Sequence, residues 1–533
     1  MSNESKRGRL EVLEARDRLN TAADEALELA LRDRLSLAPT LRSLLPLLAS
    51  HANADFVWVR TFDENLELRD FSYGGTLPFE PDDIQEGTDR GDRLQRRVGD
   101  QTLLAQPLDV AGETFGSAAI VLRGVADPEK LSIAASLLDV WCEELDNYLA
   151  SIAHARQKER IGRALGEALE EPVLEVGVNR ALEVLSQEVS FDDLFLVFRH
   201  QDDLRGATLH YRVMNEGKLL HESRSPDMEI DEFVRLHGPS LIAGDSRALL
   251  ERFGIAGGRE EVLLAGVRDQ RQLGRLVVTS KHEDFNTFDR DLLQRFASML
   301  RRRVVDFNRQ WKRLTQFFAP SVARRLLQHE DHVERFLAPR LEDVAILFCD
   351  ISGFTRISEQ VMSEPHRIGA LVDEWSRQAV DVLWETGGVF DKMVGDCIIG
   401  LWGPPFFEGE AAMRCQQAAV AAHRIRALTR AMKDHPDFPE LKDLDPPITV
   451  STGLGFAPLF VGLFGPNEDY TGFSSGMNNT ARLQGVAPGD EILCSAEFCE
   501  TLGRPELFGD PGEAKVKNVA DPLRFRPLIT DPG

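Results

Sequence analysis

The chain has 533 residues, of which 43 % are hydrophobic and 28 % charged, and a formal net charge of −25. At ~150 residues per domain this length predicts three or four units rather than one core. The negative charge argues against duplex DNA or an anionic membrane as a partner, and no apolar run approaches the ~20 residues that cross a bilayer. We therefore expect neither nucleic-acid binding nor membrane insertion.

The N-terminus and the cysteines predict a cytoplasmic protein. M-S-N-E-S-K-R-G-R contains neither the apolar core of a secretory signal nor a glycine at position 2 for myristoylation. The six cysteines are dispersed and show no C-x-x-C spacing, which is typical of reduced thiols.

Residues 1–35 are charged and follow a helical pattern. Residues 36–155 have the alternating apolar and polar segments of a folded domain. That domain begins with an amphipathic helix and ends with a longer one, with alternating strands between them. The predicted elements are a helix at 37–51, strands at 55–64, 103–110 and 115–123, and a helix at 131–152.

The same order recurs in residues 156–290, so the two stretches form an approximate internal repeat. The predicted elements are a helix at 173–185, strands at 194–199, 262–267 and 274–280, and a helix that begins after F-N-T-F-D. The ending G-x-L-x-V followed by F-x-x-x-D-x-x-L-L resembles a GAF domain. This resemblance implies two GAF-like α/β sensor domains that bind an unidentified small molecule. The F-N-T-F-D segment itself is predicted to cap the closing helix.

That closing helix continues into a linker at 291–338 with a heptad pattern. Apolar side chains recur every seven residues and also occupy the alternate positions: Leu293, Leu300, Phe307 and Leu314, with Ala297, Val304 and Trp311. The pattern predicts a parallel dimeric coiled coil between sensor and output domains. The alternative is one amphipathic helix that packs on its own domain.

The last unit, 339–533, begins with an apolar run that leads into an aspartate, F-C-D-I-S-G-F-T at 348–355. A carboxylate at the end of a buried strand needs a partner. Asp350 taken alone is better explained as the cap of a helix that starts near Thr355.

A second aspartate lies in a similar setting at 388–402, G-V-F-D-K-M-V-G-D-C-I-I-G-L-W. Two strands flank the tight turn V-G-D, which places Asp396 at a sheet end. Magnesium is typically held by one or two carboxylates together with substrate phosphates. The pair Asp350 and Asp396 therefore predicts a divalent-cation site, and the N–H groups of Gly353, Phe354 and Thr355 at a helix start suit a triphosphate.

Three segments in order resemble the class III nucleotidyl cyclases: F-C-D-I-S-G-F-T, D-K-M-V-G-D, and D-Y-T-G-F-S-S-G-M-N-N-T-A-R-L-Q. The resemblance covers about 340–528. It implies a ferredoxin-like α/β catalytic domain within an α+β multidomain chain, active as a homodimer with sites at the interface. The implied reaction converts a nucleoside triphosphate to its 3′,5′-cyclic monophosphate and pyrophosphate.

The resemblance also implies a role for each matching residue. Asp350, Asp396 and the Ile351 carbonyl would bind two Mg²⁺ or Mn²⁺ ions in a two-metal arrangement. Asn478 would position the ribose, and Arg482 would stabilise charge that develops on the phosphate.

Two further positions predict ATP as the substrate, which makes the chain resemble the class IIIb adenylate cyclases. Lys392 stands at the base-selecting position, and an ammonium group donates to adenine N1 but finds no acceptor at guanine N1. Thr471 stands at the partner position, where its hydroxyl can accept from the adenine 6-amino group. Either residue is also an ordinary strand residue.

One departure from the family pattern keeps two alternatives open. The position of a triphosphate-binding lysine holds Val519, with Lys515 and Lys517 nearby, and Ser475 replaces a frequent aspartate. The alternatives are a catalytically weak or inactive cyclase-like dimer that serves as a GAF ligand sensor or scaffold, and a guanylate cyclase, which Lys392 disfavours. The serial arrangement predicts that the GAF-like domains regulate the catalytic dimer through the linker.

Overall fold

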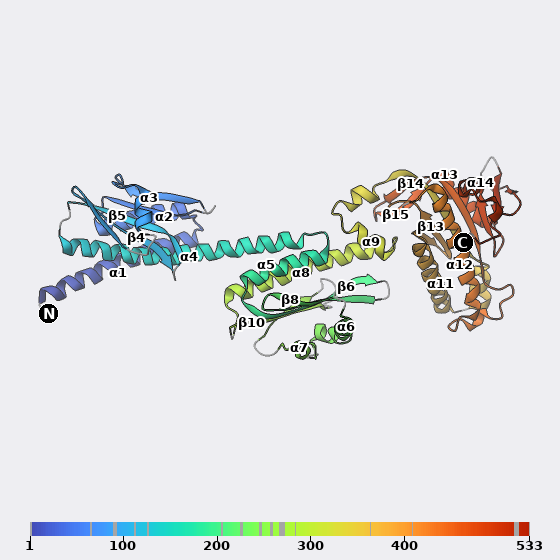
Figure 1. Cartoon of the computed structure of the whole chain (residues 1–533), viewed down its shortest axis with the longest axis horizontal. Helices are drawn as coiled ribbons and strands as arrows, with labels where there is room; N and C mark the ends of the chain where they lie inside the picture. The colour runs from blue at the N-terminus through green and yellow to red at the C-terminus, as the bar shows by residue number, and fades with distance from the viewer. Residues whose placement is uncertain are drawn as a thin grey trace. The chain divides into compact units, whose positions relative to one another are not determined.

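A computed structural model describes the backbone of residues 3–63, 67–88, 93–110, 113–124, 127–203, 206–223, 227–244, 248–255, 259–265, 272–282, 284–362, 364–407, 409–515 and 522–531. The chain divides into two compact units, Met1–Ile161 and Gly162–Gly533 (Figure 1). Within the described residues, no helix is both long enough and apolar enough to span a membrane.

The first unit is an antiparallel sheet with helices on both faces. Its elements are α1 (Asn3–Arg32), α2 (Leu37–Ala52), β1 (Phe56–Phe62), β2 (Leu68–Gly74), α3 (Pro81–Thr88), β3 (Leu94–Val98), β4 (Gln101–Val110), β5 (Glu113–Arg123) and the first part of α4 (Pro128–Leu169). The described strands are ordered β2-β1-β5-β4-β3. Alternate residues of β1 face opposite sides, so Val57 and Val59 pack on α2 and α4 while Trp58 packs under α3.

Two of the predicted segment boundaries differ from the structure. Residues 1–35 are not a separate charged segment, because α1 buries Leu19, Ala23 and Leu27 in the core that α2 and α4 share. The boundary expected at 155/156 lies inside α4, which continues to Leu169 because the next proline after Pro128 is Pro172.

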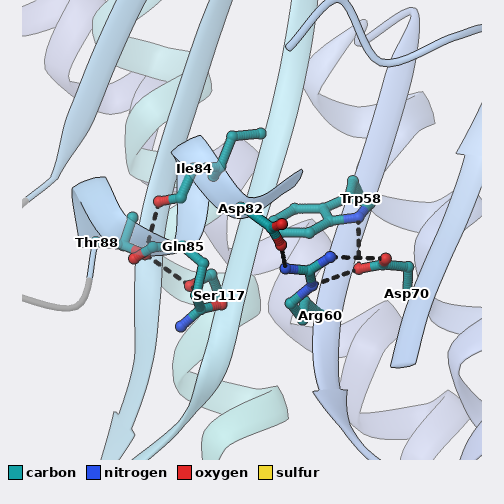
Figure 2. A network of polar contacts seen from close by, with 8 residues as sticks. All are labelled: Trp58, Arg60, Asp70, Asp82, Ile84, Gln85, Thr88 and Ser117. Carbon is teal, nitrogen blue, oxygen red and sulfur yellow. Dashed lines mark hydrogen bonds and ion pairs between the residues drawn. The ribbon is translucent and has the colours of Figure 1, made fainter. Parts of the chain in front are cut away.

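Polar contacts hold α3 to the sheet at both of its ends (Figure 2). The Arg60 guanidinium donates to Asp70 Oδ1 at 2.8 Å and to Asp82 Oδ1 at 2.5 Å, and Asp70 Oδ1 also accepts from Trp58 Nε1 at 3.1 Å. At the other end, the hydroxyls of Thr88 and Ser117 lie 2.6 Å apart. The face of the sheet that carries Trp58 is therefore closed by α3 through these polar contacts as well as by apolar packing.

The second unit begins with a sheet of similar design. Its elements are α5 (Leu174–Glu188), β6 (Phe191–Asp203), β7 (Gly206–Asn215), β8 (Lys218–Glu222), α6 (Met228–Ala243), α7 (Ala248–Arg252), β9 (Arg259–Ala265), β10 (Gln272–Ser280) and α8 (Thr287–Leu314). The described strands are ordered β8-β7-β6-β10-β9, so the first strand lies beside the last, as β1 lies beside β5. The shared feature agrees with an internal repeat. Asn286 caps α8 by accepting from the Asp289 N–H at 2.8 Å, as predicted.

The heptad seam of α8 is buried within its own chain. All seven apolar side chains of the seam are buried, Leu293 and Leu300 completely. The helix α8 as a whole contacts α5, β6, β9 and α9 of the same chain. The structure therefore has the arrangement of the alternative, one amphipathic helix packed on its own domain, and the seam offers no free apolar surface to a second helix.

The remainder of the second unit is a mixed α+β domain. Its elements are α9 (Pro320–Leu326), β11 (Arg340–Ser352), α10 (Phe354–Arg356), α11 (Pro365–Glu385), β12 (Val389–Val394), β13 (Cys397–Trp402), α12 (Ala411–Ala431), β14 (Thr449–Phe464), β15 (Asp469–Phe473), α13 (Ser475–Val486), β16 (Ile492–Ser495), α14 (Ala496–Leu502), β17 (Gly512–Ala514) and β18 (Leu523–Pro527), with short helical turns at Val333–Leu337, Ile357–Val361, Met432–Asp434, Pro439–Leu441 and Pro505–Leu507. The described strands form one sheet in the order β12-β13-β11-β14-β16-β18-β17, and β15 pairs with the far end of β14.

Helices cover both faces of this sheet. α11, α12 and α14 enclose a core on one face, to which β14 contributes Leu454. Its neighbours Gly453 and Gly455 point the other way, toward α13. A Cβ at Gly455 would lie 2.0 Å from Thr480 Oγ1, so glycine is required for α13 to approach β14 this closely.

Candidate active site

The structure brings Asp350 and Asp396 to the same end of the sheet. Asp350 lies near the end of β11, opposite Cys397 at the start of β13. Asp396 immediately precedes Cys397, in the turn between β12 and β13 where Gly395 has φ +65°. The predicted hairpin is therefore present. The capping role considered for Asp350 is wrong, because Gly353 takes the cap position of α10.

The two carboxyl groups share an unfavourable environment. Burial, followed by the neighbouring Asp396 charge, raises the pKa of Asp350 to about 6. Burial also raises the pKa of Asp396. Asp396 Oδ2 is buried without a hydrogen-bond partner.

This arrangement fits a divalent cation. Burial disfavours ionisation of both carboxyl groups, and the charge of Asp396 adds to this effect at Asp350. A cation between the two groups would stabilise their ionised forms. The unpartnered Asp396 Oδ2 supplies a free acceptor for that charge. Asp350 and Asp396 are thus suited to hold a cation, with the Ile351 carbonyl adjacent in the chain.

The segment that follows β11 forms a short, irregular helical turn. Gly353 has φ +73°, a left-handed conformation that favours glycine. A Cβ at this position would meet nothing within 4 Å, so glycine is needed for the backbone angle rather than for space. Phe354 and Thr355 belong to the three-residue helix α10, and the turn Ile357–Val361 follows it.

Asn478 and Arg482 both lie on α13, one turn apart. Asn478 is exposed and Arg482 half-buried. Arg482 Nη1 donates to Asn479 Oδ1 at 3.3 Å, so Asn479 helps to orient the guanidinium. Asn479 was not singled out from the sequence, although its i,i+3 spacing to Arg482 on a helix was the available signal. Among the described contacts, no hydrogen bond or ion pair joins Arg482 to the two acids.

Lys392 and Thr471 converge on one buried carboxyl group. Lys392 lies on β12 and Thr471 on β15, and these two strands are in contact. Lys392 Nζ is 3.9 Å from Asp391 Oδ2. Burial raises the pKa of Asp391 to about 6, and the nearby Thr471 hydroxyl opposes that rise. Asp391 was also not identified as a site residue from the sequence. The available indication was strand periodicity, because Asp391 lies two residues after buried Val389 and therefore on the same inward face of β12.

Part of the predicted triphosphate contact lies outside the described residues. Lys517 and Val519 fall in 516–521. Lys515 is exposed and directly follows β17. Ser475 is the first residue of α13, and the neighbouring Ser474 caps that helix by accepting from the N–H groups of Gly476 and Met477.

Comparison with known proteins places this domain among the cyclases. Residues 336–521 match the family described as Adenylate and Guanylate cyclase catalytic domain. An adenylate cyclase of Anabaena cylindrica is 28 % identical over 171 residues, which are 31 % of this chain and 32 % of the relative. An adenylate cyclase of Streptomyces coelicolor is 27 % identical over 182 residues, 34 % of this chain and 39 % of the relative. The matches thus span only about a third of the length of these relatives.

Solved cyclase structures also resemble this part of the chain. The adenylyl cyclase CyaB from P. aeruginosa aligns with 23 % identity and a TM-score of 0.33, over 36 % of this chain and 97 % of that one. The guanylyl cyclase Cya2 aligns with 21 % identity and a TM-score of 0.32, over 36 % of this chain and 93 % of that one. On the family match, residues 336–521 are an adenylate and guanylate cyclase catalytic domain.

Proposed function

We propose that the protein is an adenylate cyclase that converts ATP to 3′,5′-cyclic AMP and pyrophosphate at the interface of a homodimer. The observation that carries the proposal is the pair Asp350 and Asp396, half-buried at one sheet end, with Asp396 Oδ2 lacking a hydrogen-bond partner. The curated relatives named adenylate cyclase support the choice of reaction.

The residues of the chain have distinct tasks in this reaction. Two Mg²⁺ or Mn²⁺ ions bound by Asp350, Asp396 and the Ile351 carbonyl would lower the pKa of the ribose 3′-hydroxyl and offset the triphosphate charge. Asn478 orients the ribose so that the 3′-oxygen faces the α-phosphate. Arg482 stabilises the charge on the phosphate in the transition state, in a position that Asn479 helps to fix.

Base selection in this proposal belongs to Lys392 and Thr471. The ammonium group of Lys392 donates to adenine N1, and the Thr471 hydroxyl accepts from the 6-amino group. In the homodimer, each site takes Asp350 and Asp396 from one protomer and the base-selecting pair, Asn478 and Arg482 from the other. The N–H groups of Gly353, Phe354 and Thr355, together with Lys517, contact the triphosphate.

The test is cyclic nucleotide formation by the full-length protein with ATP and with GTP, each in Mg²⁺ and in Mn²⁺. We expect cyclic AMP from ATP and at least tenfold less cyclic GMP from GTP, since guanine N1 donates a hydrogen bond and therefore leaves the Lys392 ammonium group without an acceptor. Lys392→Glu should shift the ratio toward GTP. Cyclic GMP as the main product would identify a guanylate cyclase, and no product from a dimeric protein would favour the inactive sensor or scaffold.

We also propose that the GAF-like domains at 36–155 and 156–290 regulate this activity through the linker at 291–338. The support comes from the end of that linker, which contacts both base-selecting strands. The Phe317 carbonyl accepts from the Phe390 N–H at 2.9 Å and from Trp384 Nε1 at 3.1 Å. The Phe318 ring meets Tyr470, the neighbour of Thr471, with centroids 4.8 Å apart. A shift of the linker would therefore displace Lys392 and Thr471.

Phe318→Leu should lower ATP turnover several-fold while the fold is retained. The change keeps apolar volume but removes a ring pair worth about 1 kcal/mol. Phe336→Leu is the matched control, because Phe336 forms a similar edge contact with Phe406, at 4.9 Å, in which neither ring belongs to β12 or β15. Turnover of both variants should be measured together with their melting temperatures. Equal turnover in the two would argue against coupling through Phe318.

A further inference from the structure

Asp391 lies in an irregular part of β12. Phe390 pairs with Gly400 and Lys392 with Ile399, so a bulge leaves Asp391 without a partner in the ladder. Bulges of this kind re-aim a side chain. The Asp391 side chain is fully buried, and neither of its carboxyl oxygens has a hydrogen bond.

The groups around Asp391 are those that select the base. Lys392 Nζ is 3.9 Å away, and the Thr471 hydroxyl lies close enough to lower the pKa of the carboxyl group, although it makes no hydrogen bond. The charge of Asp469 opposes ionisation of Asp391. The Tyr470 hydroxyl already donates to the Pro404 carbonyl at 2.8 Å.

A buried carboxyl group without partners is unfavourable for the fold. It costs more than an apolar side chain of similar size, such as that of Val389 on the same face of β12. The Thr471 hydroxyl is likewise buried and without a partner. The Asp391 carboxyl and the Thr471 hydroxyl are thus two neighbouring buried polar groups without hydrogen bonds, next to the exposed Lys392. Such groups can be satisfied by the polar edge of a bound ligand.

We propose that Asp391 is a positioning residue for base selection, which accepts a hydrogen bond from the Thr471 hydroxyl and attracts the Lys392 ammonium group when a purine is bound. This inference deepens the proposed function and rests on it. Once Thr471 donates its proton to Asp391, only its lone pairs remain for the base. Those lone pairs accept from the 6-amino group of adenine and repel the 6-carbonyl of guanine.

Removal of Asp391 should therefore weaken discrimination rather than catalysis as such. In Asp391→Leu the Thr471 hydroxyl is free to donate, so it can bind the guanine carbonyl. We expect the ratio of kcat/KM for ATP to that for GTP to fall by about tenfold. This is the size of effect expected when the single hydrogen bond between Thr471 and the 6-position of the purine no longer discriminates between the two bases. Asp391→Asn retains an acceptor oxygen and should recover part of the ratio.

Two controls separate this role from a structural one. Asp469→Asn removes an exposed acid from the same neighbourhood and should leave the ratio unchanged. The melting temperature of Asp391→Leu should equal or exceed that of the wild type, because an unpartnered buried acid is removed. A lower melting temperature with an unchanged ratio would make Asp391 a structural residue and overturn the inference.

The pH dependence of the ratio gives a second readout. Below a pH of about 6 the Asp391 carboxyl is protonated and donates to Thr471, which inverts the polarity of the hydroxyl. The ratio of ATP to GTP turnover should fall as the pH is lowered through this value, and in Asp391→Asn it should not. Titration of Asp350 and Asp396 affects turnover of both substrates, so it cancels in the ratio of ATP to GTP turnover. An identical pH profile in Asp391→Asn would contradict the inference, because the nearby titratable groups Lys392, Asp469 and Tyr470 are unchanged in it.

Binding distinguishes failure of the inference from failure of the proposed function. The probes are the fluorescent 2′,3′-O-methylanthraniloyl derivatives of ATP and GTP, titrated in Mn²⁺ into the full-length wild type and each variant. Turnover of ATP with the same ATP to GTP ratio in wild type and Asp391→Leu would overturn the role of Asp391 alone. Preferential binding of the ATP probe without turnover, lost in Asp391→Leu, would support the role of Asp391 in a protein that is not a cyclase. If neither probe binds the wild type, both proposals fail.

Discussion

Asp396→Asn should abolish cyclic nucleotide formation and at the same time make the protein more stable. Activity should fall by about a thousandfold, or ~4 kcal/mol at 1.36 kcal/mol per tenfold, because a metal ligand is lost. The free energy of unfolding at neutral pH should rise by about 1 kcal/mol, a value reduced for the partial exposure of the side chain. The reason is that Asp396 Oδ2 is buried without a partner.

The stability gain should depend on pH in a defined direction. Burial raises the pKa of Asp396, so the folded protein binds a proton more readily than the unfolded chain does. The resulting stabilisation is complete below the ordinary pKa of 3.8 and is lost as the pH rises through the raised pKa. The advantage of Asp396→Asn over the wild type should thus be largest at neutral pH and shrink at mildly acidic pH.

Mn²⁺ provides the test of metal binding without an activity assay. At about a hundredfold excess over its Kd, Mn²⁺ should add ~2.7 kcal/mol to the stability of the wild type. Thermal unfolding should show this increase in the wild type and in the control Asp469→Asn, but not in Asp396→Asn. An equal Mn²⁺ response in Asp396→Asn would show that Asp396 does not bind the cation.

Leu300→Lys should unfold the domain that contains α5 to α8 rather than merely separate two protomers. Leu300 is completely buried within its own chain, and an unpaired buried ammonium costs about 3–5 kcal/mol. We expect a lower melting temperature or insoluble protein. If the seam instead formed a coiled coil between protomers, the variant would remain folded and become monomeric.

The control for this experiment is Arg302→Glu, which reverses a charge at an exposed position of the same helix. It should leave both stability and oligomeric state unchanged. Thermal unfolding and sedimentation velocity should be measured on the same samples, since only the two together separate an unfolded domain from a dissociated dimer. A folded, monomeric Leu300→Lys would restore the coiled-coil interpretation.

Local sequence carried the information about strands, turns and the catalytic family. The hairpin around Gly395 follows from short apolar runs that flank a tight turn, and the cap at Asn286 follows from side-chain chemistry within one helical turn. The three motifs between 348 and 484 identified a nucleotidyl cyclase domain, and the family match at 336–521 confirms that identification. The assigned roles of the individual site residues stay predictions.

Long-range packing decided the rest, because periodicity reveals that a face is apolar but not what covers it. The seam of α8 has the spacing of a coiled coil, yet its side chains are buried within a single chain, where α8 contacts α5, β6, β9 and α9. Nothing in the local sequence distinguishes Asp391 from other strand residues. Its proximity to Thr471 arises only because β12 and β15 are in contact in the folded domain. The hydrogen bond from Arg482 to Asn479 was likewise not expected from the motif, which assigned a role to Asn478 and Arg482 only. Burial and the pairing of polar groups arise only when distant segments meet, so they could not be derived from spacing along the chain.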